Sequence, residues 1–590
     1  MKHPVPTSHG TSRLLLAPLL LNSISALVLG TLSLSSQSAE LLAQAPAGAV
    51  PNIDQLRPTV PMSKEGLEAS LPEQAQPEKE MGKPQDDIKV NVKRFVLDPG
   101  APAALQNDLD TLTAPFTGPD RSYEDLMNAV SAVTRYLQRD LDLYLGYAYL
   151  PAQQPNDGEI KIAVLEGRLD QVILNWSDDI PIDKAVVEAH LARLQPGSVL
   201  HVKDVERVVF LLNDLRGLTA RFEIKQGRVV GTSSLVVTPT SEKRVSGRTE
   251  FDANGSRFSG IYRAGVTANI ASPLNKGDSM VLSTQITNGG GLLFLLGGYT
   301  LPVGSNGLKA GLSVSKVQYH LTSEVPLHLK GDATAVSAYA LYPVVRSRNL
   351  NMFAQTSAEQ RDFIDRKGDL GDTANSTKRA YELRFGLAGD FRDNWLLGGV
   401  STYDLAASAS QVIYLKNGPA LSLLDAKNRG RLNLGFSRLN NLLSNRLLAY
   451  ISVSTQKAWR NLDTTEQFSI GGPGRVRAFA PGEGTGDEGQ VGTVELRWLP
   501  TESLMGRYAR ETVFSAFYDW GHVRYKHDAS NQALGFVSDA VFSGYGVGAT
   551  WERPQVLGAR LSVAWPKQGE AQNDTVARVP RVYATVMAPF

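Results

Sequence analysis

The last nine residues, VYATVMAPF (residues 582–590), show the pattern that decides the fold. Successive side chains of a β-strand point to opposite faces. Alternate residues therefore share one face of this segment, namely Val582, Ala584, Val586, Ala588 and Phe590. A similar alternation recurs upstream, at residues 308–315, 449–454 and 544–551. One face is apolar and the other is small or polar, as in a barrel with lipid outside and water inside.

The alternation continues for about 345 residues, from Val245 to the end of the chain. A soluble β-sandwich has the same period, so one strand alone does not separate the two folds. The length of the pattern, an export signal and the aromatic terminal residue favour a transmembrane β-barrel over residues 245–590. About 20 to 22 residues for each strand and its connection give roughly 16 strands. Phe590 resembles the insertion signal of bacterial outer-membrane barrels.

The amino terminus predicts export. Lys2 and Arg13 precede a long uncharged, apolar stretch that continues to Glu40, so residues 1–45 are expected to be a signal peptide. An anchoring helix is the alternative, but Asn22, several serines and a glycine dilute the apolar run. Residues 46–87 are rich in Pro, Gln and Glu and predict a linker; whether they supply a plug helix stays open.

Between the linker and the barrel, two units with helical and strand periods follow each other. In residues 88–169, a strand pattern precedes a helix that begins at Ser122, with Asp125 placed for a capping box. Residues 170–244 read as strand, helix, helix, strand, strand. Each unit predicts a small α+β domain, and the order of elements resembles the POTRA domain. The predicted fold class is therefore mainly β, with a transmembrane barrel preceded by two domains that resemble POTRA domains.

Composition argues against several function classes. The net charge of +1 implies no strongly basic surface for nucleic acid, and the absence of cysteine removes thiol chemistry. Nucleophile-elbow, Walker A and His-Glu-x-x-His patterns are missing, so no catalytic residue, metal or cofactor is predicted. The eight histidines are interpreted as surface or lumen-lining residues, and Asp487 with Glu488 as part of a solvated turn.

One loop has an unusual centre. The stretch GGPGRVRAFAPGEGTGDEG (residues 471–489) has the glycine and proline content of a loop, yet Arg477 stands between apolar neighbours. A guanidinium can grip a carboxylate through two parallel hydrogen bonds. A loop held inside a wide pore needs such a directional tether, whereas an exposed loop does not.

Two POTRA-like units, a barrel and this loop resemble the two-partner secretion transporters, the exporters of haemolysin and filamentous haemagglutinin. Further matches are TEFDANGSRFSGIYRAG at the start of the barrel, YTLPVGSNGL near its third strand, and FYDWG at residues 517–521. The resemblance implies an outer-membrane transporter with periplasmic POTRA domains. Such a protein binds a secreted partner by its amino-terminal secretion domain and passes it unfolded through the barrel, in some relatives activating a haemolysin.

The resemblance also assigns residues. The family's loop tip is a Val-Arg-Gly-aromatic tetrad, and its arginine pairs with the acidic residue of a Phe-x-Asp-x-Gly motif on the wall. Carried over, these are Val476, Arg477, Ala478 and Phe479 at the tip, and Phe517, Asp519 and Gly521 on the wall. Ala478 departs from the family's glycine, which matters if the backbone needs a positive φ there.

Two alternatives remain open on the sequence. A barrel-assembly factor of the same superfamily typically carries more than two POTRA units, and a passive porin needs neither these units nor a tethered arginine. The favoured interpretation implies outer-membrane lipid, the barrel-assembly machinery and the exported protein as partners, a monomeric barrel and no nucleic acid.

Overall fold

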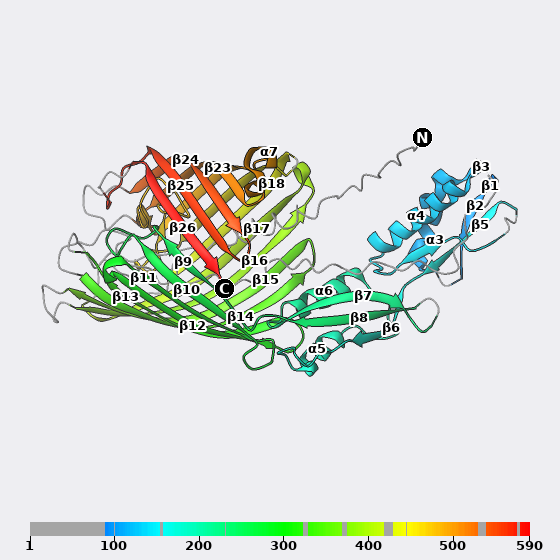
Figure 1. Cartoon of the computed structure of the whole chain (residues 1–590), viewed down its shortest axis with the longest axis horizontal. Helices are drawn as coiled ribbons and strands as arrows, with labels where there is room; N and C mark the ends of the chain where they lie inside the picture. The colour runs from blue at the N-terminus through cyan, green and yellow to red at the C-terminus, as the bar shows by residue number, and fades with distance from the viewer. Residues whose placement is uncertain are drawn as a thin grey trace, which may run out of the picture.

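The computed structural model describes residues 89–99, 101–153, 157–229, 232–322, 329–367, 375–417, 429–443, 445–528, 538–574 and 579–590. The predicted signal peptide, linker and possible plug helix lie outside the described residues. Among the described residues, every helix is too short or too polar to cross a membrane. Two α+β units extend from one end of a large β-barrel (Figure 1).

The first unit holds a three-stranded sheet in the order β2-β5-β4 and a two-stranded sheet of β1 and β3. Ser122 caps helix α4, because its side chain accepts from the Asp125 amide while the Asp125 carboxylate accepts from the Ser122 amide. One face of α4 is apolar and buried; it comprises Leu126, Ala129, Val130, Val133 and Leu137. The elements are β1 (Val90–Val92), β2 (Arg94–Leu97), α3 (Ala103–Thr113), η1 (Ala114–Phe116), β3 (Gly118–Arg121), α4 (Tyr123–Arg139), β4 (Tyr147–Tyr149) and β5 (Glu159–Leu165).

The second unit has the predicted order of strand, two helices and two strands. Its sheet runs β6-β8-β7, so β6 and β7 are the edge strands. Apolar residues of both helices and all three strands form one buried core. The elements are β6 (Arg168–Leu174), α5 (Lys184–Leu191), α6 (Val202–Asn213), β7 (Leu218–Gln226) and β8 (Thr232–Ser241).

The remaining chain forms a closed antiparallel barrel of sixteen strands. Its first half comprises β9 (Val245–Asp252), β10 (Arg263–Ala271), β11 (Ser279–Thr287), β12 (Leu292–Val303), β13 (Leu308–His320), β14 (Leu329–Arg346), β15 (Leu350–Lys367) and β16 (Ser376–Asp393). Its second half comprises β17 (Gly399–Lys416), β18 (Arg429–Leu443), β19 (Leu447–Ala458), β22 (Glu488–Trp498), β23 (Thr512–Arg524), β24 (Asp539–Arg553), β25 (Leu557–Gln568) and β26 (Arg581–Pro589). Short helical turns between strands are η2 (Asn288–Gly290), η5 (Trp395–Leu397), α7 (Glu502–Met505) and η6 (Gly506–Arg510).

The predicted alternation places apolar side chains on the outside of the barrel. Leu312 is 63% exposed and Tyr545 is 51% exposed, whereas charged residues such as Glu495 and Arg431 are buried on the inner side. The strand prediction and the predicted strand number are therefore confirmed.

The last strand closes the barrel against the first. β26 pairs with β9 in antiparallel register, from Thr585 opposite Asp252 to Pro589 opposite Arg248. Phe590 extends the ladder, because its amide donates to the Gly247 carbonyl (2.9 Å) and its carbonyl accepts from the Gly247 amide (3.1 Å). A side chain at Gly247 would overlap the Phe590 ring, so the glycine makes room for the terminal aromatic residue.

Candidate functional site: a lumen loop clasped to the barrel wall

The connection between β19 and β22 folds inward instead of outward. Its short strands β20 (Phe468–Ser469) and β21 (Thr485–Gly486) pair with each other. Apolar loop residues pack on inward-facing residues of β22 to β25 and form one buried cluster: Phe468, Ile470, Val476, Ala478, Phe479, Val491, Phe517, Val523, Phe542 and Ala564. This lumen loop, residues 459–487, is thus fixed to the wall partly by apolar burial.

Arg477 lies at the centre of this contact and meets two carboxylates. Its Nε donates to Asp519 Oδ2 (2.9 Å) and its Nη2 to Asp519 Oδ1 (2.8 Å), which is a bidentate grip. Its backbone amide also donates to Asp519 Oδ2 (3.1 Å), and its Nη1 donates to Glu495 Oε2 (2.9 Å). We call Arg477, Asp519 and Glu495 the tip clasp.

The wall motif at residues 517–521 works through alternation along β23. The Phe517 ring lies under the Arg477 guanidinium, with 3.2 Å from Cζ to the ring centroid. Two residues on, Asp519 provides the carboxylate. Two further on, Gly521 leaves space, because a Cβ there would lie 3.1 Å from both Ile470 and Val476. The three residues share the inner face of one strand, which explains their spacing.

Solvent is largely excluded from the clasp. The side chains of Arg477, Asp519 and Glu495 are 13%, 1% and 9% exposed. Burial disfavours the charged guanidinium, but the hydrogen bonds and charges of Asp519 and Glu495 outweigh it, and the pKa of Arg477 lies above its ordinary value. Thr493 Oγ1 donates a further hydrogen bond to Asp519 (2.9 Å).

The other tip residues are anchored as well. Val476 is fully buried, and the Phe479 ring stacks on Phe542 with centroids 4.2 Å apart. The Tyr583 hydroxyl donates to the Phe479 carbonyl (2.7 Å). Ala478 has no positive φ, so alanine is not strained where the family has glycine. Its methyl group faces Gly544, where a Cβ would lie only 2.5 Å from it.

Sequence reasoning missed part of the clasp. Glu495 was not singled out, nor was Arg497, whose Nε donates to Glu495 Oε1 (2.8 Å). The signal was the segment VELRW, in which Val494, Leu496 and Trp498 are exposed outside while the two charges point inward. Alternating charges on a barrel strand mark the lumen side.

Two interpretations from the sequence are wrong. Asp487 and Glu488 are buried, not part of a solvated turn; Asp487 accepts from Gln467 Nε2 (2.8 Å) and Glu488 from Lys457 Nζ (2.7 Å). The loop folds into the protein and takes its acidic end with it. His190 is buried in α5, not on the surface or in the lumen, and its Nδ1 donates to the Val186 carbonyl (2.8 Å).

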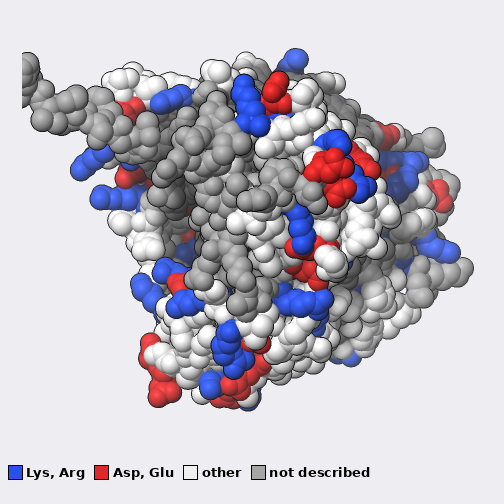
Figure 2. All heavy atoms as spheres, turned by 90° about the vertical axis from the view of Figure 1, so that its right-hand side faces the viewer, with Lys and Arg blue, Asp and Glu red and all other residues white. Residues whose placement is uncertain are grey.

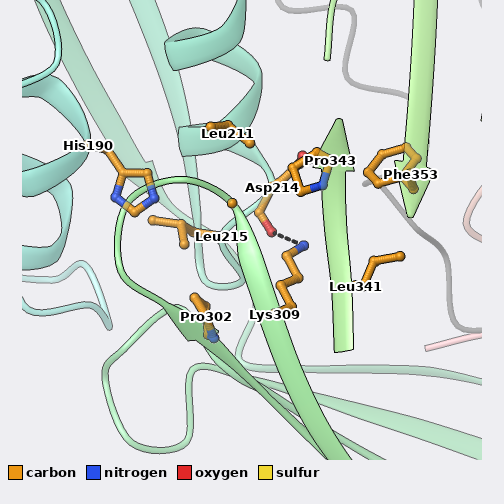
Figure 3. A pocket seen from close by; sticks show the side chains of 10 residues that line it. His190, Leu211, Asp214, Leu215, Pro302, Lys309, Leu341, Pro343 and Phe353 are labelled. Atoms are coloured by element: carbon orange, nitrogen blue, oxygen red, sulfur yellow. Dashed lines mark hydrogen bonds between the residues drawn. The ribbon is translucent and has the colours of Figure 1, made fainter. Parts of the chain in front are cut away.

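A second polar contact joins the second α+β unit to the barrel. Asp214, at the end of α6, receives two hydrogen bonds of 2.9 Å from Arg346, the last residue of β14. Lys309 of β13 reaches the same place and donates to the Asp214 carbonyl (3.2 Å; Figure 3). Asn351 accepts from Arg346 Nη1 (2.7 Å), and the guanidinium lies over Phe210 at 4.6 Å. We call Asp214, Arg346 and Lys309 the joint.

The charge distribution agrees with the near-zero net charge. On the face seen in Figure 2, the Lys and Arg side chains of the described residues lie among Asp and Glu. Within the described residues, no group of three or more His, Cys, Asp or Glu could hold a metal ion.

Comparison with known families decides between the alternatives. Residues 231–550 match the family model described as haemolysin secretion/activation protein ShlB/FhaC/HecB, and residues 90–167 match that of the ShlB-type POTRA domain. The chain belongs to this family. It is an outer-membrane two-partner secretion transporter, with POTRA domains in the periplasm. The family consists of transporters, not enzymes.

Relatives agree along most of the chain. The heme/hemopexin transporter protein HuxB of Haemophilus influenzae strain 86-028NP is 22% identical over 488 residues, which cover 81% of this chain and 84% of the relative. The outer membrane transporter CdiB of Dickeya dadantii strain 3937 is 23% identical and covers 80% of this chain and 82% of its own.

Solved structures show the same fold. CdiB from Escherichia coli has a TM-score of 0.64 at 18% identity and covers 98% of this chain and 100% of its own. BamA from Haemophilus ducreyi, solved without POTRA domains 1–3, has a TM-score of 0.53 at 14% identity and covers 85% and 100%.

Proposed function

We propose that this transporter exports a large partner protein with an amino-terminal secretion domain, and that the tip clasp holds the lumen loop in its transport-competent position. The clasp is the observation that carries the proposal. Arg477 connects a buried loop to two inward-facing carboxylates on β22 and β23. A loop that only connected two strands would need no such grip, because it could lie in water outside the barrel.

The α+β units supply a docking surface for the partner. Strands β6 and β7 are the edge strands of the second sheet, although the start of β6, at Arg168 and Leu169, already bonds to residues 197–199. An unfolded partner adds to such an edge as an extra strand, through main-chain hydrogen bonds that demand little of its sequence. Its path then leads through the barrel, so during transport the loop has to move aside from the starting position that the tip clasp fixes. For the three units we propose the bounds 88–169, 170–244 and 245–590; strand β6, which belongs to the second sheet, begins slightly earlier, at Arg168.

Removal of Arg477 leaves buried charge without its partner. Asp519 would lose both side-chain donors of Arg477 and the alignment of the residue's backbone amide. Glu495 would lose one hydrogen-bond donor. Breaking a buried pair by removing one partner costs about 3–5 kcal/mol. The loop is expected to leave its seat, while the ladder of the barrel strands is untouched.

The test compares Arg477→Ala with Arg446→Ala, which removes an exposed arginine from the β18–β19 turn. Mass spectrometry of the culture medium should show the loss of one large protein with Arg477→Ala and normal export with Arg446→Ala. Heat-modifiable gel mobility should show an assembled barrel in both variants. Unchanged export with Arg477→Ala refutes the role of the clasp.

Deletion of the whole chain tests the export function itself. The expected result is the loss of a single secreted protein from the medium. A broad loss of outer-membrane proteins would instead indicate a barrel-assembly factor, and loss of small-solute uptake would indicate a porin.

A further inference from the structure

The lumen loop is attached to the wall at a second place, far from its tip. The first part of the loop, residues 459–467, leaves β19 and crosses to the inner faces of β16, β17 and β18. There Lys378 Nζ of β16 donates to Asp463 Oδ1 (2.7 Å), and the Tyr414 hydroxyl of β17 donates to Asp463 Oδ2 (2.6 Å).

A second acidic residue of the same segment meets β18. Glu466 lies 3.4 Å from Arg431 Nη1 and 3.8 Å from Arg429 Nη1. Arg431 also donates to Glu382 on β16 (2.8 Å), so the two strands and the loop share one network of charges. We call Lys378, Asp463, Glu466, Arg431 and Arg429 the stem lock.

The stem lock is a buried contact and not a surface ion pair. The side chains of Lys378 and Asp463 are 7% and 1% exposed, and those of Glu466 and Arg431 are similarly buried. The segment is also ordered locally, because the Thr465 amide and hydroxyl both donate to Asp463 Oδ1 (3.0 and 2.7 Å). Removing one partner of a pair buried this deeply costs much more than removing one partner of an exposed pair, because it leaves an uncompensated charge away from water.

The tip clasp and the stem lock contact the barrel wall at different heights along the barrel axis and on different strands. Lys378 lies near the start of β16 and Arg429 is the first residue of β18, and both strands begin at the end of the barrel away from the POTRA units. Tyr414 lies near the end of β17, on the same side. Asp519 lies in the middle of β23. Strand β19 separates β18 from β22 in the barrel order. A loop released only at its tip is therefore still held across the outer mouth of the barrel.

We propose that the stem lock is a second constraint on the lumen loop, and that Lys378 and Asp463 are positioning residues for transport. The lumen is clear only while both the tip clasp and the stem lock are open, so each contact lowers the fraction of time for which it is clear, and loss of either one raises that fraction. This inference rests on the proposed role of the loop as the obstacle in the lumen, and it adds a second set of residues that control it.

The absence of cysteine from the whole chain gives a clean test. The full-length variant Lys378→Cys/Asp463→Cys has no stem lock when its thiols are free, and a bifunctional methanethiosulfonate reagent joins the two positions until a reductant cleaves it. The probe is the KCl current of the purified protein in planar lipid bilayers. With free thiols, the current should exceed that of the unsubstituted chain by at least roughly ten-fold. Bridging should return it to the original level, and reduction should raise it again.

The matched control is Thr402→Cys/Ser437→Cys. These two residues are buried register partners on β17 and β18, and their hydroxyls hydrogen-bond to each other at 2.8 Å. Bridging them should leave the KCl current unchanged, because neighbouring wall strands stay paired. Heat-modifiable mobility checks that every variant is a folded barrel.

The single variants Lys378→Met and Arg477→Ala separate this inference from the proposed function. A raised current with Lys378→Met supports the stem lock whatever Arg477→Ala does. If Arg477→Ala alone has no effect on current or export, only the proposed role of the tip clasp is refuted. If Lys378→Met and the free-thiol variant both conduct like the unsubstituted chain and bridging changes nothing, the stem lock is refuted.

Discussion

Loss of the ion pair at the joint should loosen the second POTRA unit from the barrel by a measurable amount. Asp214 and Arg346 are both buried and make a bidentate contact, so replacing either partner leaves a charge in a poorly hydrated place. Arg346→Met keeps an apolar chain over Phe210, and Asp214→Asn keeps the shape of the carboxylate. Breaking a buried pair in this way costs about 3–5 kcal/mol.

The two substitutions should differ in size. After Arg346→Met, Lys309 remains beside Asp214, and a carboxyl group can also take up a proton. After Asp214→Asn, two cations remain next to each other without an anion, and arginine cannot lose its charge. We therefore expect the contact between the second POTRA unit and the barrel to weaken by about 3 kcal/mol with Arg346→Met and by about 5 kcal/mol with Asp214→Asn, the two ends of that range.

Hydrogen exchange measures this loosening at two amides that bridge the unit and the barrel. The Asp183 amide donates to the Asn275 carbonyl (2.7 Å) and the Arg216 amide to the Gly277 carbonyl (3.1 Å). At 1.36 kcal/mol for each factor of ten, their exchange should accelerate roughly 150-fold with Arg346→Met and roughly 5,000-fold with Asp214→Asn.

Arg348→Met is the matched control, because Arg348 lies two residues from Arg346 in the same turn but is exposed. In this variant, exchange of the same two amides should stay within a factor of about two or three of that in the unsubstituted chain, as for most surface substitutions. The reasoning is refuted if Arg346→Met accelerates exchange less than about ten-fold, or if Asp214→Asn has the smaller effect.

Two further predictions concern His190 and Gly544. Burial lowers the pKa of His190 below its ordinary value of 6.5, so the unfolded state takes up the proton first; the second POTRA unit should lose stability as the pH falls below 6.5. Amide protection in α5 should drop between pH 7.5 and 5.5 in the unsubstituted chain and less so in His190→Gln; equal drops would contradict this. Gly544→Ala should raise the KCl current, because the new methyl group would overlap Ala478, and adding Ala478→Gly should lower it again in part. No recovery of the KCl current in the double variant would show that the contact between positions 544 and 478 does not control the position of the loop tip.

The sequence was sufficient for the barrel because alternation is a local property. The side of a strand on which Leu312 or Tyr545 lies follows from its neighbours in the chain, and the structure confirms it. The helix from Tyr123 was equally predictable, since Ser122, Asp125 and the apolar stripe act over a few residues.

The partners of the lumen-facing charges were not predictable in the same way. Alternation shows that Glu495 and Lys378 point inward, but their partners depend on the register of distant strands and on the path of the loop. Arg477 with Asp519 was predicted only through a family resemblance. The stem lock joins residues 85 positions apart and had no such guide. Asp487 was misread because a Gly-rich acidic loop in water and one folded into a lumen have the same composition.

The seam between β26 and β9 sets a condition on biogenesis. The side-chain hydrogen bond from Asn254 to Thr585 joins residues 331 positions apart, so the ring stays incomplete until β26 has reached β9. The entropy lost in joining such distant ends rises only slowly with length, but long-range pairing slows folding considerably. During this delay β9 presents an unpaired edge, which invites wrong association with other chains. A chain that lacks β26 would keep that edge permanently.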